Sequence, residues 1–115
     1  MTEGDVALAR LPQADGFIKL RPVILLRQLP PFGDWLVCGV SSQLHQQVPH
    51  FDETIEPAHP DFTCSGVKTA SLIRLGFITA LPAGQIAGSI GAIARDRHAR
   101  LLQNLCTHLR PEPLT

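Results

Sequence analysis

Tyrosine is absent from the sequence, tryptophan and methionine occur once each, and charged residues make up only 17% of the 115 residues. Neither sign of charge is in excess, because ten Lys and Arg balance ten Asp and Glu. The composition therefore lacks the strong basic excess that is typical of many nucleic-acid-binding proteins. Hydrophobic residues reach 44%, which excludes a disordered chain held open by its charges. We expect one domain with a core of its own.

Long apolar runs are also missing. The longest, residues 35–40 with Gly39 included, is far shorter than the roughly 20 residues that cross a bilayer. The first residues, Met1-Thr2-Glu3-Gly4-Asp5, are acidic, whereas a signal peptide begins basic and then becomes apolar. We therefore expect a cytoplasmic protein without a membrane partner.

Cysteine is scarce and widely spaced, at Cys38, Cys64 and Cys106. An odd number at such spacing does not predict a disulfide framework, so we expect reduced, buried thiols. The intervals between His50, His59 and Cys64 match no zinc-binding pattern. The sequence predicts neither a metal site nor a cofactor.

Short apolar segments separated by turn residues predict a mainly β protein. Strands are expected at residues 6–11, 21–26, 35–40, 53–56, 71–75, 77–81 and 84–93, with the rest of 44–66 as loop. The aliphatic run within 21–26 is typical of a strand buried on both faces. Pro22 has no amide hydrogen to donate, so we expect it at the start of that strand. Gly76 is expected to form a bulge or tight bend.

The periodicity becomes helical from about Arg95. Four leucines then give the segment one apolar face, namely Leu101, Leu102, Leu105 and Leu109. Prolines at 111 and 113 end the helix. Many short strands followed by one helix favour a small barrel or curled sheet. We expect a single domain over residues 1–110 and a tail over 111–115.

Several sequence segments occur in a characteristic order, namely Gly4-Asp5-Val6, Arg21-Pro22-Val23-Ile24-Leu25-Leu26, Val37-Cys38-Gly39-Val40-Ser41-Ser42-Gln43, Gly66-Val67-Lys68, Ser71-Leu72-Ile73-Arg74-Leu75, Phe77-Ile78-Thr79 and Ile90-Gly91-Ala92-Ile93. Together they cover nearly the whole chain. The ordered set resembles the MazF/PemK-like toxins of bacterial type II toxin–antitoxin systems. The resemblance implies a small SH3-like barrel with a C-terminal helix, usually a homodimer.

The same resemblance implies metal-independent cleavage of single-stranded RNA, silenced by a cognate antitoxin that occupies the RNA groove. Carried over by position, the catalytic residues are Arg21 and Ser41. In such a reaction the 2′-OH beside the scissile phosphate attacks it, which yields a 2′,3′-cyclic phosphate and a 5′-hydroxyl. Arg21 would stabilise the added negative charge and Ser41 would donate one more hydrogen bond. The general base is left open between Asp15, a histidine such as His45, and solvent.

Four further residues are candidate RNA contacts, namely Phe17, Lys19, Ser42 and Gln43. Phe17 would stack on a base, Lys19 would steer the phosphate backbone, and Gln43, beside Ser42, would read a base edge. Lys19 is alternatively a solvated loop charge, and Gln43 alternatively turns the chain. Arg74 is expected to pair inside the barrel.

A second interpretation exists for the catalytic candidates. Arg21 would pair with a carboxylate at a strand end, and Ser41 would only satisfy a loop amide. The protein would then be a non-catalytic interaction module on the same barrel. It would be either a degenerate toxin or a toxin that blocks a protein target, as the CcdB-type toxins do.

Overall fold

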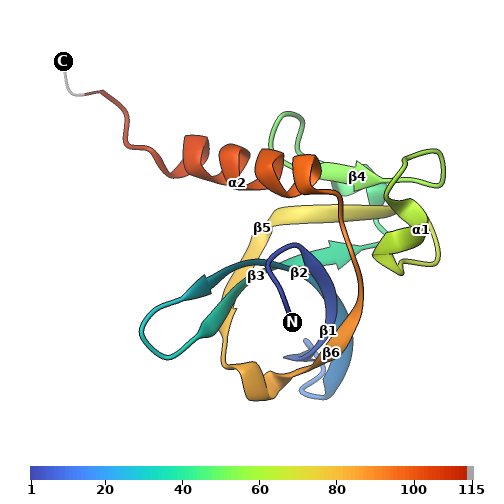
Figure 1. Cartoon of the computed structure of the whole chain (residues 1–115), viewed down its shortest axis with the longest axis vertical. Coiled ribbons are helices and arrows are strands. Elements are labelled where there is room, and N and C mark those ends of the chain that lie inside the picture. The colour runs from blue at the N-terminus through green and yellow to red at the C-terminus, as the bar shows by residue number, and fades with distance from the viewer. Residues whose placement is uncertain (114–115) are drawn as a thin grey trace.

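Six antiparallel strands form one curled sheet, and a C-terminal helix packs against it (Figure 1). The computed structural model describes residues 1–113. The sheet order is β4-β5-β3-β2-β1-β6, with β1 Asp5–Pro12, β2 Ile18–Leu29, β3 Asp34–Ser41, β4 Glu53–Ile55, β5 Ser71–Leu81 and β6 Ile86–Ala92. The helices are α1 Phe62–Ser65 and α2 Arg95–Leu109, and the 3₁₀ turns are η1 Leu44–Gln46 and η2 Ala83–Gln85. This half-barrel with its terminal helix confirms the predicted fold class.

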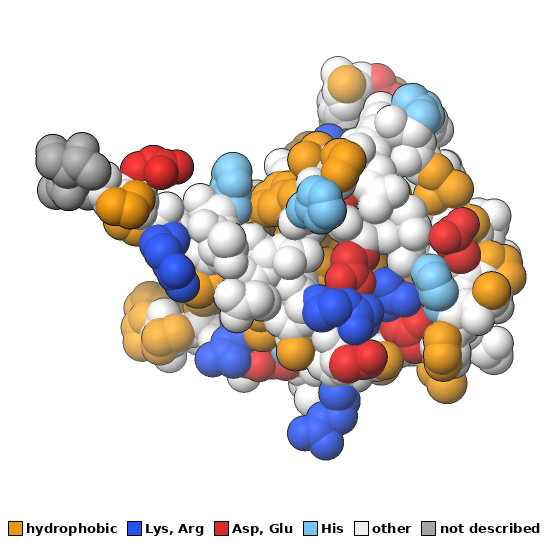
Figure 2. All heavy atoms as spheres, turned by 90° about the horizontal axis from the view of Figure 1, so that it is seen from above, with side chains coloured by type: hydrophobic (Ala, Val, Ile, Leu, Met, Phe, Trp, Pro, Cys, Tyr) orange, Lys and Arg blue, Asp and Glu red, His pale blue; other side chains and the backbone are white. Residues whose placement is uncertain are grey.

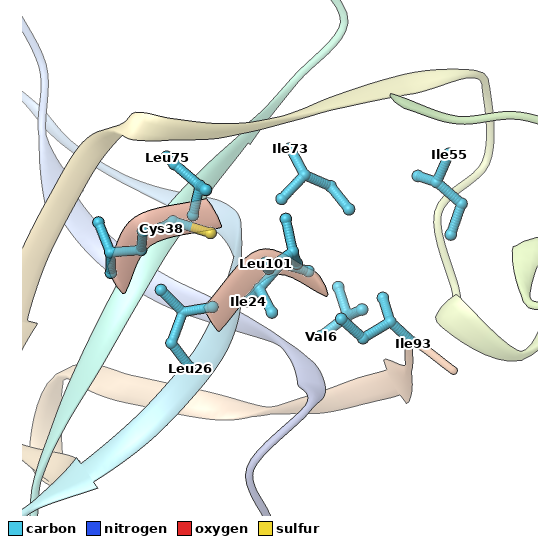
Figure 3. Packing of buried hydrophobic residues seen from close by; sticks show 10 residues of the cluster. Val6, Ile24, Leu26, Cys38, Ile55, Ile73, Leu75, Ile93 and Leu101 are labelled. Atoms are coloured by element: carbon cyan, nitrogen blue, oxygen red, sulfur yellow. The ribbon is translucent and has the colours of Figure 1, made fainter. Parts of the chain in front are cut away.

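The two faces of the curled sheet bury separate hydrophobic clusters. Ile24 and Leu26 of β2 belong to the first cluster, whereas Val23 and Leu25 belong to the second. Leu101 of α2 packs into the first cluster (Figure 3). Successive side chains of a strand point to opposite faces, so a continuous aliphatic run fills both clusters at once. The prediction that the aliphatic run within residues 21–26 is buried on both faces is confirmed for residues 23–26.

The prediction that Pro22 stands at the start of its strand is wrong. β2 starts at Ile18, and Pro22 pairs with Leu8 in the middle of the strand. The pairing of β2 with β3 begins only at Val23, so residues 18–22 have β1 as their sole neighbour in the sheet. A proline is tolerated there because that part of β2 is an edge strand.

β5 is a single strand where two were predicted. Its register against β3 jumps between the pairs Gly39–Arg74 and Cys38–Ile78, which leaves residues 75–77 as a bulge centred on Gly76. The bulge predicted at Gly76 is confirmed. It bends β5, which curves around the side of the barrel (Figure 1).

The C-terminal helix is confirmed, but its apolar face is shorter than predicted. Leu101 and Leu105 are buried, whereas Leu109 is 69% exposed because the last turn of α2 extends beyond the barrel (Figure 1). No described helix is both long and apolar enough to span a bilayer. Of the predicted tail, residues 111–113 follow without regular secondary structure, and 114–115 lie outside the described residues.

Three smaller predictions need correction. Residues 44–66, expected to be loop apart from one strand, also contain η1 and the short helix α1. The last strand begins at Ile86 and not at residue 84, because η2 precedes it. All three thiols are free, but only Cys38 is buried, while Cys64 and Cys106 are exposed.

Candidate functional site

A groove of about 740 Å³ opens where the β1–β2 turn, the end of β3 and the bulge of β5 meet. Three of its lining residues are cations, namely Arg21, Lys68 and Arg74. Among the described residues 1–113, no Asp, Glu or His lines it. We call it the cationic groove. Its local charge suits a polyanion even though the whole chain is neutral.

The sheet register explains why residues distant in sequence meet there. Val23 pairs with Gly39, and Gly39 pairs with Arg74. Residues two apart on a strand share a face, so Arg21, Ser41 and Arg74 project from the same side of β2, β3 and β5. Gly39 has no side chain, which lets the ring of Phe77 lie against it, 3.0 Å from where a Cβ would stand.

Arg21 is exposed and lines this groove. Its Nη2 donates a hydrogen bond of 2.9 Å to Oε1 of Gln13, a neutral acceptor. It makes no ion pair with any described residue. The alternative interpretation, an arginine consumed by a carboxylate, is therefore wrong, and the guanidinium charge stays available.

Ser41 ends β3 and lines the groove together with Ser42 and Gln43. Its Oγ accepts the N–H of Gln43 at 3.0 Å, so the alternative role of satisfying a loop amide is real. That bond uses a lone pair of the oxygen and leaves the hydroxyl hydrogen to donate elsewhere. The backbone contact thus holds the hydroxyl oxygen at the groove.

The prediction that Arg74 pairs inside the barrel is wrong. This arginine is half-buried, lines the groove and forms no ion pair within the described chain. The bulge beside Arg74 is bonded to a buried carboxylate. Asp52 accepts the N–H of Leu75 at 3.0 Å and the N–H of Val48 at 2.9 Å. Asp52 thereby holds the bulge from which Arg74 reaches the groove.

Sequence reasoning missed two other lining residues as functional groups. Lys68 follows α1, and only its place beside Gly66 in the family resemblance drew attention to it. Gly66 adopts φ +78°, and a Cβ there would overlap the carbonyl oxygen of Ile90. Phe77 is the aromatic residue of the groove, although its position after the predicted bulge resembled an ordinary strand.

Two predicted RNA contacts and two candidate bases lie outside the groove lining. Phe17, 69% exposed, and Lys19 lie on the β1–β2 hairpin beside it. Asp15 accepts the N–H of Phe17 at 3.0 Å, and His45 lies exposed in η1. None of these four side chains lines the groove that holds Arg21 and Ser41.

A second hollow, of about 450 Å³, lies where the start of α2 meets β4 and the turn before α1. There the buried guanidinium of Arg97 bonds Asp61 at 2.8 Å and Glu53 at 2.9 Å, and Arg100 bonds Glu53 at 2.9 Å. Basic and acidic side chains lie in contact on the face that α2 covers (Figure 2). Four carboxylates and two arginines line this hollow, and both arginines are paired, so its charge does not suit a polyanion. Within residues 1–113, no group of three or more His, Cys, Asp or Glu side chains is placed to hold a metal.

The half-barrel and its groove define a recognisable class of fold. No protein-family model and no curated protein matches the sequence. Among solved structures, the chain is similar to the Mycobacterium tuberculosis toxin MazF-mt6, with a TM-score of 0.66 and 15% sequence identity. The match covers 90% of this chain and 93% of that chain. The chain therefore has the fold of a MazF toxin.

Proposed function

We propose that this protein is a toxin that cleaves single-stranded RNA without a metal ion. The observation that carries the proposal is the meeting of Arg21, Arg74 and the Ser41 hydroxyl in a groove that no carboxylate of residues 1–113 lines. Free guanidinium groups bind phosphate oxygens through paired N–H donors. The fold shared with MazF-mt6 supports the same function.

The reaction requires stabilisation of charge more than it requires an added nucleophile. The 2′-oxygen attacks the neighbouring phosphorus, the bond to the 5′-oxygen breaks, and a 2′,3′-cyclic phosphate and a 5′-hydroxyl result. Arg21 and Arg74 bind the phosphate oxygens that gain negative charge, and Ser41 donates to a third position. Both arginines stay protonated, so neither acts as the base.

The proton transfers are assigned to solvent. No imidazole or carboxylate lines the groove within residues 1–113, so water or hydroxide takes the 2′-OH proton and water protonates the leaving 5′-oxygen. Ser42 and Gln43 contact the RNA inside the groove, and Lys19 and Phe17 contact it where the strand leaves along the β1–β2 hairpin. Likeness to a MazF toxin also favours a cytoplasmic homodimer with a cognate antitoxin.

The test compares single-stranded RNA with its all-deoxy copy, both incubated with the purified chain in EDTA. We expect cleavage of the RNA alone, with a cyclic phosphate end. Arg21→Ala should lower kcat by about 10²–10³, the usual loss for one preorganised donor. Arg27→Ala is the matched control, because Arg27 lies on the same strand but pairs with Glu3 at 3.5 Å, outside the groove. It should cleave at the wild-type rate.

Two results would contradict parts of the proposal. Full activity of Arg21→Ala would remove this groove as the catalytic site. A folded, antitoxin-free sample that cuts no RNA would remove the nuclease function and favour the interaction module.

A further inference from the structure

Arg21 has a single side-chain partner in the described part of the chain, and that partner comes from the β1–β2 turn. Its Nη2 lies 2.9 Å from Oε1 of Gln13. Arg21 is exposed on an edge segment of β2, and no other side-chain hydrogen bond or ion pair within residues 1–113 holds its guanidinium. The direction of the proposed catalytic group therefore depends on Gln13.

Gln13 is itself held at every polar group. Its N–H donates to Phe17 O at 2.8 Å, and its carbonyl accepts the N–H of Gly16 at 2.9 Å. Its side-chain Nε2 donates to Leu11 O at 3.2 Å, which leaves Oε1 for Arg21. A carbonyl can only accept and a guanidinium can only donate, so the amide has one possible orientation. The turn holds Gln13 in place, and Gln13 holds the guanidinium of Arg21.

We propose that Gln13 is a positioning residue that orients Arg21 toward the phosphate oxygens that gain negative charge during cleavage, and that it does so without neutralising the guanidinium. The inference rests on the proposed function. An amide is the one side chain of this length that donates to Leu11 O and accepts from Arg21 together. A carboxylate could not donate to Leu11 O, and it would pair with Arg21 and neutralise one of the three cations of the groove.

Two substitutions separate orientation from charge. Gln13→Leu leaves a branched apolar side chain at this position and keeps the charge of Arg21, but it removes both hydrogen bonds. It should lower the single-turnover cleavage rate by about 10², the cost of a misplacement near 1 Å, and leave affinity for the all-deoxy copy unchanged. Gln13→Glu should weaken binding of that copy as well as slow cleavage. Full cleavage by Gln13→Leu would overturn the proposal.

The matched control is Gln28→Leu. Gln28 also donates its Nε2 to a backbone carbonyl, that of Gly33 at 3.2 Å, but in the β2–β3 hairpin outside the groove. This variant should cleave at the wild-type rate. Equal losses in both variants would mean that a turn, and not Arg21, had been disturbed.

A double-mutant cycle tests whether Gln13 acts through Arg21. In the Arg21→Ala background, Gln13→Leu should cause no further loss of rate, because the group that it orients is gone. Independent, multiplying losses would contradict a positioning role.

A readout without RNA separates this proposal from the nuclease function. Nitrogen-15 NMR of the Arg21 guanidinium should show slowed rotation of its Nη groups in the wild type and fast rotation in Gln13→Leu. If the wild type cuts no RNA but this difference is present, the nuclease function fails and the positioning role stands. Equal rotation in both proteins overturns the positioning role whatever happens to RNA.

Discussion

The three cysteine side chains lie in unlike surroundings. Cys38 is fully buried in β3, and this burial raises the pKa of its thiol to about 12. Cys64 in α1 and Cys106 in α2 are exposed. Only a thiolate reacts readily with disulfide reagents, so burial makes Cys38 inert twice over, by blocking access and by suppressing ionisation.

This contrast predicts the labelling of the native protein. Ellman's reagent at pH 8 should modify Cys64 and Cys106 within minutes and Cys38 only after denaturant is added. Cys64→Ser and Cys106→Ser should each remove one fast thiol. A third fast thiol in the native wild type would contradict the buried position of Cys38.

At the scale of elements, the first turn of α2 is held by a buried ion pair between Arg97 and Asp61, in addition to the packing of Leu101 in the core. Arg97 donates to both oxygens of Asp61, at 2.8 and 3.1 Å, and to the carbonyl of Thr54 at 2.9 Å. Asp61 also accepts the N–H of Ala94, so it satisfies a free amide at the start of the helix from another segment. Burial opposes ionisation of Asp61, but the bonds from Arg97 and Ala94 outweigh it and lower its pKa.

A lowered pKa in the folded state makes the stabilisation by Asp61 depend on pH. Its contribution to the free energy of unfolding is complete above the pKa of the unfolded state, about 3.9. The contribution is lost as the pH falls through the lower pKa of the folded state. Asp61→Asn should therefore be much less stable than the wild type at pH 7, and the difference should shrink below about pH 4. Urea unfolding at several pH values measures this. A difference that stays constant with pH would contradict it.

Removal of the cation is the complementary change. Arg97→Ala leaves Asp61 buried without its partner, so it should lower the free energy of unfolding by about 3–5 kcal/mol. Arg100→Ala is the control, because its side chain is half-exposed, and it should cost less than about 1 kcal/mol.

At the scale of the whole molecule, the cations of this neutral chain fall into two groups. Some are paired with carboxylates, and others form no ion pair in the described part of the chain. The chain is neutral, and Arg27, Arg97 and Arg100 are each matched by carboxylates. Arg21, Lys68 and Arg74 form no ion pair within residues 1–113 and share one groove. Three unpaired cations therefore meet in a groove that no carboxylate of residues 1–113 lines, which attracts a polyanion to it.

This arrangement predicts how RNA binding responds to salt. With four cations on phosphates, the three of the groove and Lys19 of the β1–β2 hairpin, the logarithm of the affinity for the non-cleavable copy should fall against the logarithm of salt concentration with a slope near −2.8, about −0.7 for each contact. Lys68→Ala should make the slope shallower by about 0.7, and Arg27→Ala should leave it unchanged. Fluorescence anisotropy from 50 to 300 mM salt measures the slope. Binding that ignores salt would exclude the groove as the phosphate site.

Local pattern was sufficient for most elements. The aliphatic run of β2 and the leucine spacing of α2 are consequences of burial, which acts on neighbouring residues and so leaves a readable period. The position of Pro22 within β2 was predicted wrongly, because no sequence pattern distinguishes an edge segment from the rest of a strand. Leu109 was misplaced because helical spacing does not say how far a helix extends beyond the sheet.

The sequence by itself determined the mainly β fold with its terminal helix, and it drew attention to Arg21 and Ser41 through the order of short segments around them. Only the tertiary structure decided that Arg74 and Lys68 join them, that Gln13 holds Arg21, and that Asp15 and His45 stay outside. The reason is physical. Which residues meet across a sheet depends on register, and the register of β5 is shifted by a bulge that a distant carboxylate, Asp52, holds in place.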